Sequence, residues 1–355
     1  MMTIIKKTML ALMIVTGLFI VSQSVLKTQP HVKENDQVIP KVEVASVFPR
    51  YEFGNHSFGE LSLLNNGEVW AVGYDGQHIQ RMYHSKDRGK NWSDVEVPSN
   101  GFSFKSLSFS DSLNGWAVGG KGLIIRTTDG GKNWEKLKAP THSELHAAHF
   151  FNSQVGYIAG REKFGDKVTD EVWGNMEILC TKSSGEEWRI CYKEKKPSSV
   201  FRITTPSESE ALIVLDGNRL IRTDNQGATW HLVDLHGKKV SSVALTRDGA
   251  LWIVGNNGSF EHSDDRGRTW QHMRTFDVNA NNTNWWDVAF NQAGAGIAVG
   301  ESGLLAATLD SGKTWKMLDS NIRDHLRAVY LQDNYAIILG EKNIYTVTIN
   351  ASTQK

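Results

Sequence analysis

Hydrophobic and polar residues alternate along most of this chain in short runs that end at glycine-rich turns. The stretch Gly115–Trp134 shows the unit clearly: an apolar run from Trp116 ends at a glycine turn, an alternating segment begins at Leu123, and a second turn follows at Asp129. Alternation with a period of two, bounded by glycine and aspartate, is typical of β-strands joined by tight turns. The stretch therefore predicts three short strands and two turns.

The second turn recurs six times with the same residue types, in the pattern (S/T)-x-D-x-G-x-x-W. An Asp or Asn side chain can accept bonds from the amides of its own turn, glycine can take a positive φ, and tryptophan can pack between sheets. The third copy has Ser183 where most have aspartate. The conserved positions of the motif are occupied by Asp87, Gly89, Trp92, Asp129, Gly131, Trp134, Gly185, Trp188, Asn225, Gly227, Trp230, Asp265, Gly267, Trp270, Asp310, Gly312 and Trp315.

The spacing of the motif predicts a β-propeller, because repeats of roughly 40 residues are typical of four-stranded propeller blades. Six motifs define six blades, and further strand-like runs follow over Leu326–Leu331, Tyr335–Leu339 and Asn343–Ile349. A three-stranded last blade would leave an open sheet edge. The alternating segment Val38–Phe48 can fill it. We therefore predict an all-β, seven-bladed β-propeller of four-stranded antiparallel blades over residues 38–350, with the ring closed by an N-terminal strand.

These motifs carry a family resemblance. The repeated turn resembles the Asp-box, or BNR repeat, of sialidases, sortilin-type receptors and several glycoside hydrolases. The longer pattern in Gly115–Trp134, with its WAVG and TTDGGKNW, is similar to the photosystem II assembly factor family of Ycf48-like propellers. This resemblance implies an exported, non-catalytic binding or assembly module that helps a membrane protein complex to assemble. The box turns themselves are scaffold in every such family, so they do not identify a function.

The N-terminus has the composition of a targeting segment. Lys6 and Lys7 precede an apolar run from Met9 to Val21, and small residues follow at Ser22 and Ser24. Residues 1–26 are therefore expected to be either a cleaved signal peptide or a retained membrane anchor. Both alternatives place the propeller outside the cytoplasm, in the periplasm or another extracytoplasmic space. Residues 27–37 are expected to be a polar linker.

Charge and cysteine content bear on the class of partner and on the redox compartment. Lys plus Arg and Asp plus Glu both number 39, so no global charge points to a nucleic-acid partner. Cys180 and Cys191 lie on the two arms of the third box hairpin, as plausible cross-strand neighbours. In an oxidising compartment they are expected to form a disulfide; the alternative is two buried free thiols.

The residues needed for enzymatic chemistry are not brought together by the sequence. The segment Phe201-Arg202-Ile203-Thr204 resembles a sialidase FRIP motif, but it follows three boxes and lacks the proline, so it is interpreted as the inner strand of blade four. A two-carboxylate glycosidase needs paired acids in one cleft, and no pair can be placed among Asp166, Asp170 and Glu171. The chain is therefore predicted not to be an enzyme. A sialidase-like or other glycan-active hydrolase, or a glycan-binding propeller, is the alternative.

Neither a metal nor a cofactor is predicted. His142, His146 and His149 have helix-like spacing, but within a strand they would point to alternating faces. We expect a monomer that binds a protein partner in the cell envelope, with a glycan as the alternative ligand.

The binding site is predicted on the face that carries the links between blades. Blade three inserts Arg161–Asn175 there, and the link into blade six brings two adjacent tryptophans to the same face. Long loops on a rigid scaffold often carry binding residues, and aromatic and arginine side chains are common anchors. The alternative is a solvated loop and a packed tryptophan pair. The candidate binding residues are Arg161, Lys163, Phe164, Trp173, Trp285 and Trp286.

Overall fold

The computed structural model describes residues 38–49, 58–74, 80–98, 101, 103–164, 172–195, 198–273 and 283–353. The expected signal or anchor, residues 1–26, and the expected linker, residues 27–37, lie outside these ranges. Residues Ile39–Ser352 form one compact unit of seven four-stranded sheets. Within the described part of the chain, no helix is long and apolar enough to cross a membrane.

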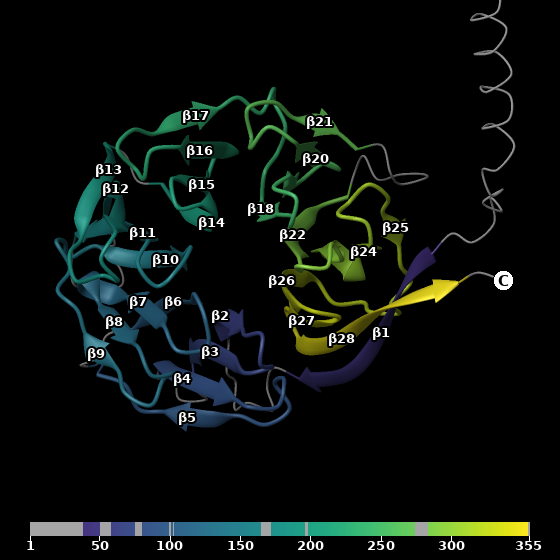
Figure 1. Cartoon of the computed structure of the whole chain (residues 1–355), viewed down its shortest axis with the longest axis horizontal. Helices are drawn as coiled ribbons and strands as arrows, with labels where there is room; N and C mark the ends of the chain where they lie inside the picture. Colours follow the sequence, from purple (N-terminus) through teal and green to yellow (C-terminus); the bar gives the residue numbers. More distant parts are fainter. Residues whose placement is uncertain are drawn as a thin grey trace, which may run out of the picture. The chain divides into compact units, whose positions relative to one another are not determined.

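Six of the sheets are built from four strands that follow one another in the chain. In each of these sheets the first strand lies nearest the centre of the ring and the fourth lies at its outer rim (Figure 1). All pairings within the sheets are antiparallel. Blade one contains β2 (Phe58–Leu63), β3 (Val69–Tyr74), β4 (Gln80–Ser85) and β5 (Ser93–Val95), and blade two contains β6 (Phe104–Phe109), β7 (Gly115–Gly119), β8 (Ile124–Thr127) and β9 (Glu135–Lys136). Blade three contains β10 (Glu144–Phe150), β11 (Gly156–Phe164), β12 (Val172–Thr181) and β13 (Arg189–Glu194), and blade four contains β14 (Val200–Ser207), β15 (Glu210–Leu215), β16 (Arg219–Thr223) and β17 (His231–Val233). Blade five contains β18 (Ser242–Leu245), β19 (Leu251–Val254), β20 (Phe260–Ser263) and β21 (Gln271–His272), and blade six contains β22 (Trp285–Phe290), β23 (Gly296–Gly300), β24 (Leu305–Thr308) and β25 (Lys316–Met317).

The seventh blade joins the two ends of the propeller sequence. It contains β26 (Leu326–Gln332), β27 (Tyr335–Gly340) and β28 (Asn343–Thr353), and β1 (Val38–Pro49) pairs with β28 as the outermost strand (Figure 1). The predicted seven-bladed fold and its closure by an N-terminal strand are therefore confirmed. The segment Phe201–Thr204 also lies in an inner strand, β14, as expected.

The box turns form a side-chain network that repeats from blade to blade. In the sixth box, Thr308 Oγ1 accepts a bond from the amide of Gly312 at 3.0 Å, and Asp310 Oδ1 accepts one from the amide of Thr314 at 2.8 Å. The second carboxylate oxygen accepts the Thr314 hydroxyl at 2.7 Å. Ser311 and Gly312 have φ angles of 59° and 88°, so the turn uses two consecutive left-handed residues.

Each box also contacts the preceding blade, as the second box shows. Gly131 has φ 79°, and a Cβ added there would lie 2.1 Å from the ring of Trp70 on β3. The ring of Trp134 lies 5.8 Å from that of Trp70 in an edge-to-face arrangement. Glycine is thus required for two reasons: the positive φ and the close approach of the neighbouring tryptophan.

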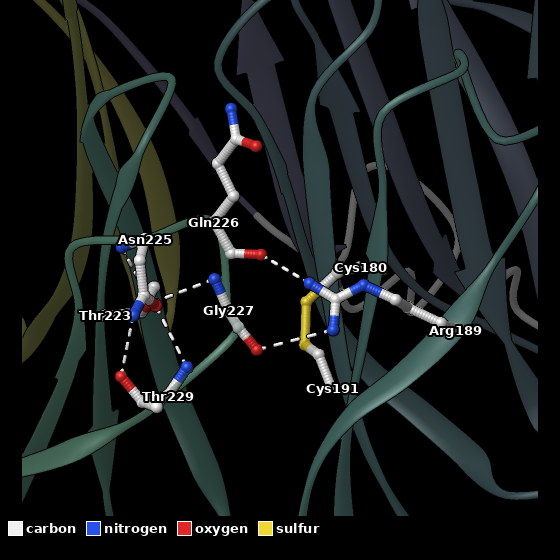
Figure 2. Close-up of a disulfide and its surroundings, with 8 residues drawn as sticks. All are labelled: Cys180, Arg189, Cys191, Thr223, Asn225, Gln226, Gly227 and Thr229. Atoms are coloured by element: carbon white, nitrogen blue, oxygen red, sulfur yellow. Dashed lines mark hydrogen bonds between the residues drawn. A yellow bond between two sulfur atoms is a disulfide. The ribbon is translucent and has the colours of Figure 1, made fainter.

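The third box is reinforced by a disulfide. Ser183 Oγ accepts one amide bond, from Glu187 at 3.0 Å, but a hydroxyl has no second oxygen to accept another. Cys180 and Cys191 are bonded in the structure, and their sulfurs pack beneath Gly227 of the next box (Figure 2). Arg189, which lies on β13 with Cys191, donates to the carbonyls of Gln226 and Gly227 (Figure 2).

A substitution in the sixth box tests the carboxylate network. Asp310→Ala is expected to lower the free energy of unfolding by about 1–2 kcal/mol, because two donors of Thr314 lose their acceptor. Asp310→Asn is the matched control, since Asn225 in the fourth box also bonds twice to Thr229: its Oδ1 accepts the amide at 2.9 Å, and its Nδ2 donates to the hydroxyl at 2.8 Å. Chemical denaturation of both variants is the measurement, and equal losses would contradict the assignment.

The disulfide is predicted to form in the exported protein as well. Intact-mass analysis of protein from the cell envelope, alkylated with and without prior reduction, measures the number of free thiols. Oxidised protein should carry none, and reduction should lower the free energy of unfolding by roughly 2–3 kcal/mol at most, because the closed loop is short. Two alkylated cysteines without reduction would refute the pairing.

Candidate functional site

The direction of the strands gives the propeller two different faces. In a four-stranded antiparallel blade the turn between the third and fourth strands lies on the same face as the turn between the first and second. All six box turns therefore lie on one face, the box face. The turns between second and third strands, the links between blades and the starts of the inner strands lie on the opposite face, the link face.

A β-bulge near the start of the inner strand recurs around the ring. In blade two, Phe104 pairs with Gly119 and Ser106 with Val118, so Lys105 is the extra residue of the bulge. Bulges re-aim side chains and are frequent beside binding sites. The same shift occurs in five more of the seven inner strands, where the extra residues are Gly59, His146, Phe201, Trp286 and Arg327.

The glycine that ends the WAVG run lies against the segment that enters the inner strand of blade two. A Cβ on Gly119 would lie 1.7 Å from the carbonyl oxygen of Ser103, just before the inner strand begins. The amide of Gly120 donates to that same carbonyl at 2.8 Å. No residue larger than glycine could occupy this position without moving the segment that enters β6.

The bulged residues surround a cavity of about 460 Å³ at the mouth of the central channel, here called the cup. Its rim consists of Lys105, His146, Phe201, Trp286 and Arg327. The side chain of Phe201 is 57 % exposed. The guanidinium of Arg327 lies 3.8 Å from the centre of the Trp286 ring and also pairs with Glu341. The rim therefore combines apolar surface with positive charge.

An ion pair spans the floor of the cup. Arg202 on β14 donates to Asp287 on β22, and Ser242, from the blade between them, donates to Asp287 Oδ1 at 2.5 Å. Asp287 Oδ2 accepts the amide of Val329 at 2.9 Å. Burial acts to lower the pKa of Arg202, but the charge of Asp287, its hydrogen bond and the electrostatic effects of Tyr330 and Glu60 together outweigh burial and raise that pKa above its usual range. The guanidinium therefore stays charged and paired.

Glu60 faces this ion pair from β2. Burial raises the pKa of Glu60 to about 7, against the opposing effects of a hydrogen bond from Ser106 and the charge of Arg202. Burial also raises the pKa of Tyr330, whose hydroxyl accepts the amide of Leu61 at 3.2 Å. The floor thus holds one group that changes its charge near neutral pH.

His146 and His149, which line the cup, are uncharged near neutral pH. Burial lowers the pKa of His149 to about 4, assisted by the charge of Arg202, and lowers that of His146 to about 4, assisted by Arg161 and Lys105. Both line the cup, because the bulge at His146 breaks the alternation expected for the strand. The prediction that these histidines point to alternating faces was wrong for this reason. Among the described residues, no group of three or more His, Cys, Asp or Glu could hold a metal ion.

The two tryptophans of blade six have different environments. Trp285 is 1 % exposed and belongs to the packed core between blades, so it cannot contact a partner directly. Its place among the candidate binding residues is corrected: the residue after it, Trp286, is the bulged one that lines the cup.

The insertion of blade three is an extension of a hairpin. β11 continues to Phe164 and β12 begins at Val172, with Lys163 paired to Trp173 across the two arms. The expectation of a loop is therefore corrected for the described part of the insertion, residues 161–164 and 172–175, which continues the ladder of the blade. Arg161 lies at the base of the arms, with Nη1 3.4 Å from Ser199 Oγ. The side chains of Lys163, Phe164 and Trp173 lie outside the described part, as do Asp166, Asp170 and Glu171.

Several residues of the rim and floor were not among the candidates predicted from the sequence, although the alignment of the repeats contains a signal for their position. When the repeats are aligned on the closing tryptophan of the box, Lys105, Phe201 and Trp286 occupy one equivalent position. These residues differ in type, while the residue before each of them is apolar and the residue after it is polar. Such a variable position inside a regular strand indicates a side chain that does not serve the core.

The charge state of Glu60 should make stability depend on pH. The folded protein holds its proton up to a pKa of about 7, whereas the unfolded chain releases it near 4.5. At Glu60 the folded state therefore binds more protons between these values, so the contribution of this group to the free energy of unfolding should fall as pH rises through them. Glu60→Gln should remove that contribution, so the variant should gain stability relative to wild type as pH rises, by about 3 kcal/mol at pH 8. Denaturation of both proteins from pH 4 to 8 is the measurement; parallel curves would contradict the assignment.

Comparison of the amino-acid sequence with known proteins identifies a family. The family model described as photosynthesis system II assembly factor YCF48 matches residues 55–164, 104–236 and 233–305. The photosystem II stability/assembly factor HCF136 of Arabidopsis thaliana is 25 % identical over 295 residues, covering 75 % of this chain and 70 % of that protein. The photosystem II assembly lipoprotein Ycf48 of Synechococcus sp. (strain CC9902) is 24 % identical, and the match covers 80 % of this chain and 82 % of that protein.

Solved structures share the fold. A structure of YCF48 bound to D1 peptide superposes with a TM-score of 0.63 at 18 % identity, covering 88 % of this chain and 97 % of that one. A GH74 xyloglucanase from Xanthomonas campestris has a TM-score of 0.62 at 11 % identity, covering 87 % of this chain and 53 % of its own. At such identities the likeness shows the fold alone. The family model, in contrast, spans most of the propeller sequence, and the chain therefore belongs to the Ycf48 family of photosystem II assembly factors.

Proposed function

We propose that this protein is an exported, non-catalytic propeller that captures a segment of a protein partner in the cup and so assists assembly of a membrane protein complex. The relatives HCF136 and Ycf48 are named assembly or stability factors, and a YCF48 has been solved with a peptide bound. Several Ycf48 relatives are also named lipoproteins, which supports export and tethering through residues 1–26. The protein acts as a monomer, with one cup per chain.

The observation that carries this proposal is the convergence of the bulged side chains. The inner strands need no bulge to form their ladders, yet five of them direct large side chains into one cavity on the link face. Exposed Phe201 and the Trp286–Arg327 pair supply the aromatic and arginine groups that most often dominate protein interfaces. A rigid ring holds them, so little ordering is needed when a partner binds.

The extended hairpin of blade three adds a second contact surface. It rises from the link face beside the cup, and Arg161 at its base is close enough to influence the charge of His146 on the rim. Arg161, Lys163, Phe164 and Trp173 remain candidate contacts along its arms. A partner segment lying in the cup would extend across this hairpin.

The carboxyl groups of the cup favour binding over hydrolysis. A glycosidase needs one carboxyl as acid and a second as base or nucleophile. Asp287 is 2 % exposed and accepts bonds from Arg202, Ser242 and Val329, so it is not available to a substrate. Glu60 alone would remain. Propellers of similar fold include enzymes such as the xyloglucanase, so the fold does not decide the question.

A pair of double variants tests the binding face. Phe201→Ala with Trp286→Ala should reduce capture of the native partner at least about tenfold, because two anchors are removed from a preformed cavity. Leu113→Ala with Phe151→Ala is the matched control: both are exposed apolar residues, at 54 % and 40 %, in turns of the box face. Crosslinking in the native envelope followed by quantitative mass spectrometry is the measurement.

Three outcomes decide among the alternatives. Replacing Arg161–Asn175 by a short glycine-rich turn should leave folding intact and weaken capture. Loss of capture in the box-face control, with capture retained by the rim variant, would show that the wrong face was chosen. Turnover of fluorogenic glycosides or sialosides that disappears in Glu60→Gln would show an enzyme instead.

A further inference from the structure

The floor of the cup presents hydrogen-bond donors to whatever enters it. Nε and Nη2 of Arg202 bond to Ser242 and Asp287, while Nη1 has no hydrogen-bond partner among the residues that the structure describes. The hydroxyl of Tyr330 accepts an amide bond from Leu61, which leaves its own hydrogen to donate. These donors fit a ligand group that only accepts hydrogen bonds.

The rim favours a negative charge on that group. Lys105 and Arg327 stand at the entrance, and Arg202 stands at the floor, so an incoming amine would meet three cations. Asp287 offers an amine little, because its oxygens already accept three bonds. Among the acidic residues that line the cup, this leaves Glu60 as the group that opposes an anion.

The groups around Glu60 come from several blades. Ser106 of β6, Arg202 of β14, Asp287 of β22 and Tyr330 of β26 interact with it. Lys105 of β6, His149 of β10 and Arg327 of β26, which are charged or titratable, line the same cavity. The histidine and the tyrosine are uncharged near neutral pH, so Arg202 and Asp287 set the field at Glu60. Glu60 and Asp287 already share the positive charge of Arg202. A third carboxylate beside them would raise the pKa of Glu60, because a further negative charge disfavours its ionised form.

We propose that the cup binds a carboxylate of the protein partner against Nη1 of Arg202 and that Glu60 takes up a proton from solvent as it does so. This inference rests on the proposed function and adds a ligand chemistry and a dependence on pH. Protonated Glu60 no longer repels the incoming carboxylate and can donate a hydrogen bond to it. Because uncomplexed Glu60 is half protonated near pH 7, binding should weaken across the pH range of most extracytoplasmic spaces.

Equilibrium dialysis of the full chain with labelled phenylacetate tests the inference. This probe carries one carboxylate and one ring, which match the floor and the aromatic part of the rim. Its affinity should fall about tenfold between pH 7.5 and pH 8.5, since one proton is taken up on binding. Phenylacetamide, the neutral analogue, should show no such dependence. A pH-independent affinity for phenylacetate, or no binding at any pH, would overturn the proposal.

Two variants identify the titrating group. Glu60→Gln should bind phenylacetate with a constant affinity across this range, while Glu208→Gln, the same change at an exposed site away from the cup, should behave as wild type. Retained pH dependence in Glu60→Gln would refute the role of Glu60. Proton uptake by wild-type protein in weakly buffered solution gives a second readout that needs no variant.

Failure of this inference can be separated from failure of the proposed function. If the rim double variant loses the native partner but capture is insensitive to pH and to Glu60→Gln, the proton-linked carboxylate site is wrong and the binding face stands. If the rim double variant captures the partner normally, the proposed function itself is wrong, whatever the dialysis shows.

Discussion

The inner edge of each blade is the constraint on which this structure depends. No neighbouring strand pairs with that edge, yet its buried amides and carbonyls need partners. Side chains of adjacent blades supply them: Ser106 accepts the amide of Ala148, Thr204 donates to the carbonyl of Val243, and Tyr330 accepts the amide of Leu61 across the ring closure. Polar residues must therefore line the channel for the ring to hold together.

This requirement explains why a structural feature can also form a binding site. Asp287 accepts the amide of Val329 in the next blade and, with its other oxygen, holds Arg202 across the channel. Removing Asp287 would leave a buried amide and an unpaired guanidinium. The same carboxylate thus connects two blades and orients the charged group that faces the cup. Contacts that stabilise the ring and the groups that line the cup share one layer of residues.

The two faces of the propeller differ in how far packing constrains their residues. The box face repeats one turn with little variation, because each box glycine and tryptophan must fit the preceding blade. The third box has Ser183 in place of the acid and is reinforced by the Cys180–Cys191 disulfide, which packs against Gly227 (Figure 2). On the link face the repeated packing requirement is the glycine beside the start of the inner strand, such as Gly119. Away from that glycine, blade three lengthens its hairpin and the bulged residues differ from blade to blade.

The sequence by itself determined the architecture, since its signals are local. The hydroxyl, acid, glycine and tryptophan of a box lie within one turn, and their spacing along the chain fixes the number of blades and leaves Val38–Phe48 to close the ring. The cup required the tertiary structure, because its groups meet only when the ring closes: Arg202 and Asp287 are 85 residues apart and two blades apart. Adjacent tryptophans show the same limit. Alternation indicated that one of the pair faces inward, but only the shift in register at β22 decided that Trp285 packs in the core and Trp286 lines the cup.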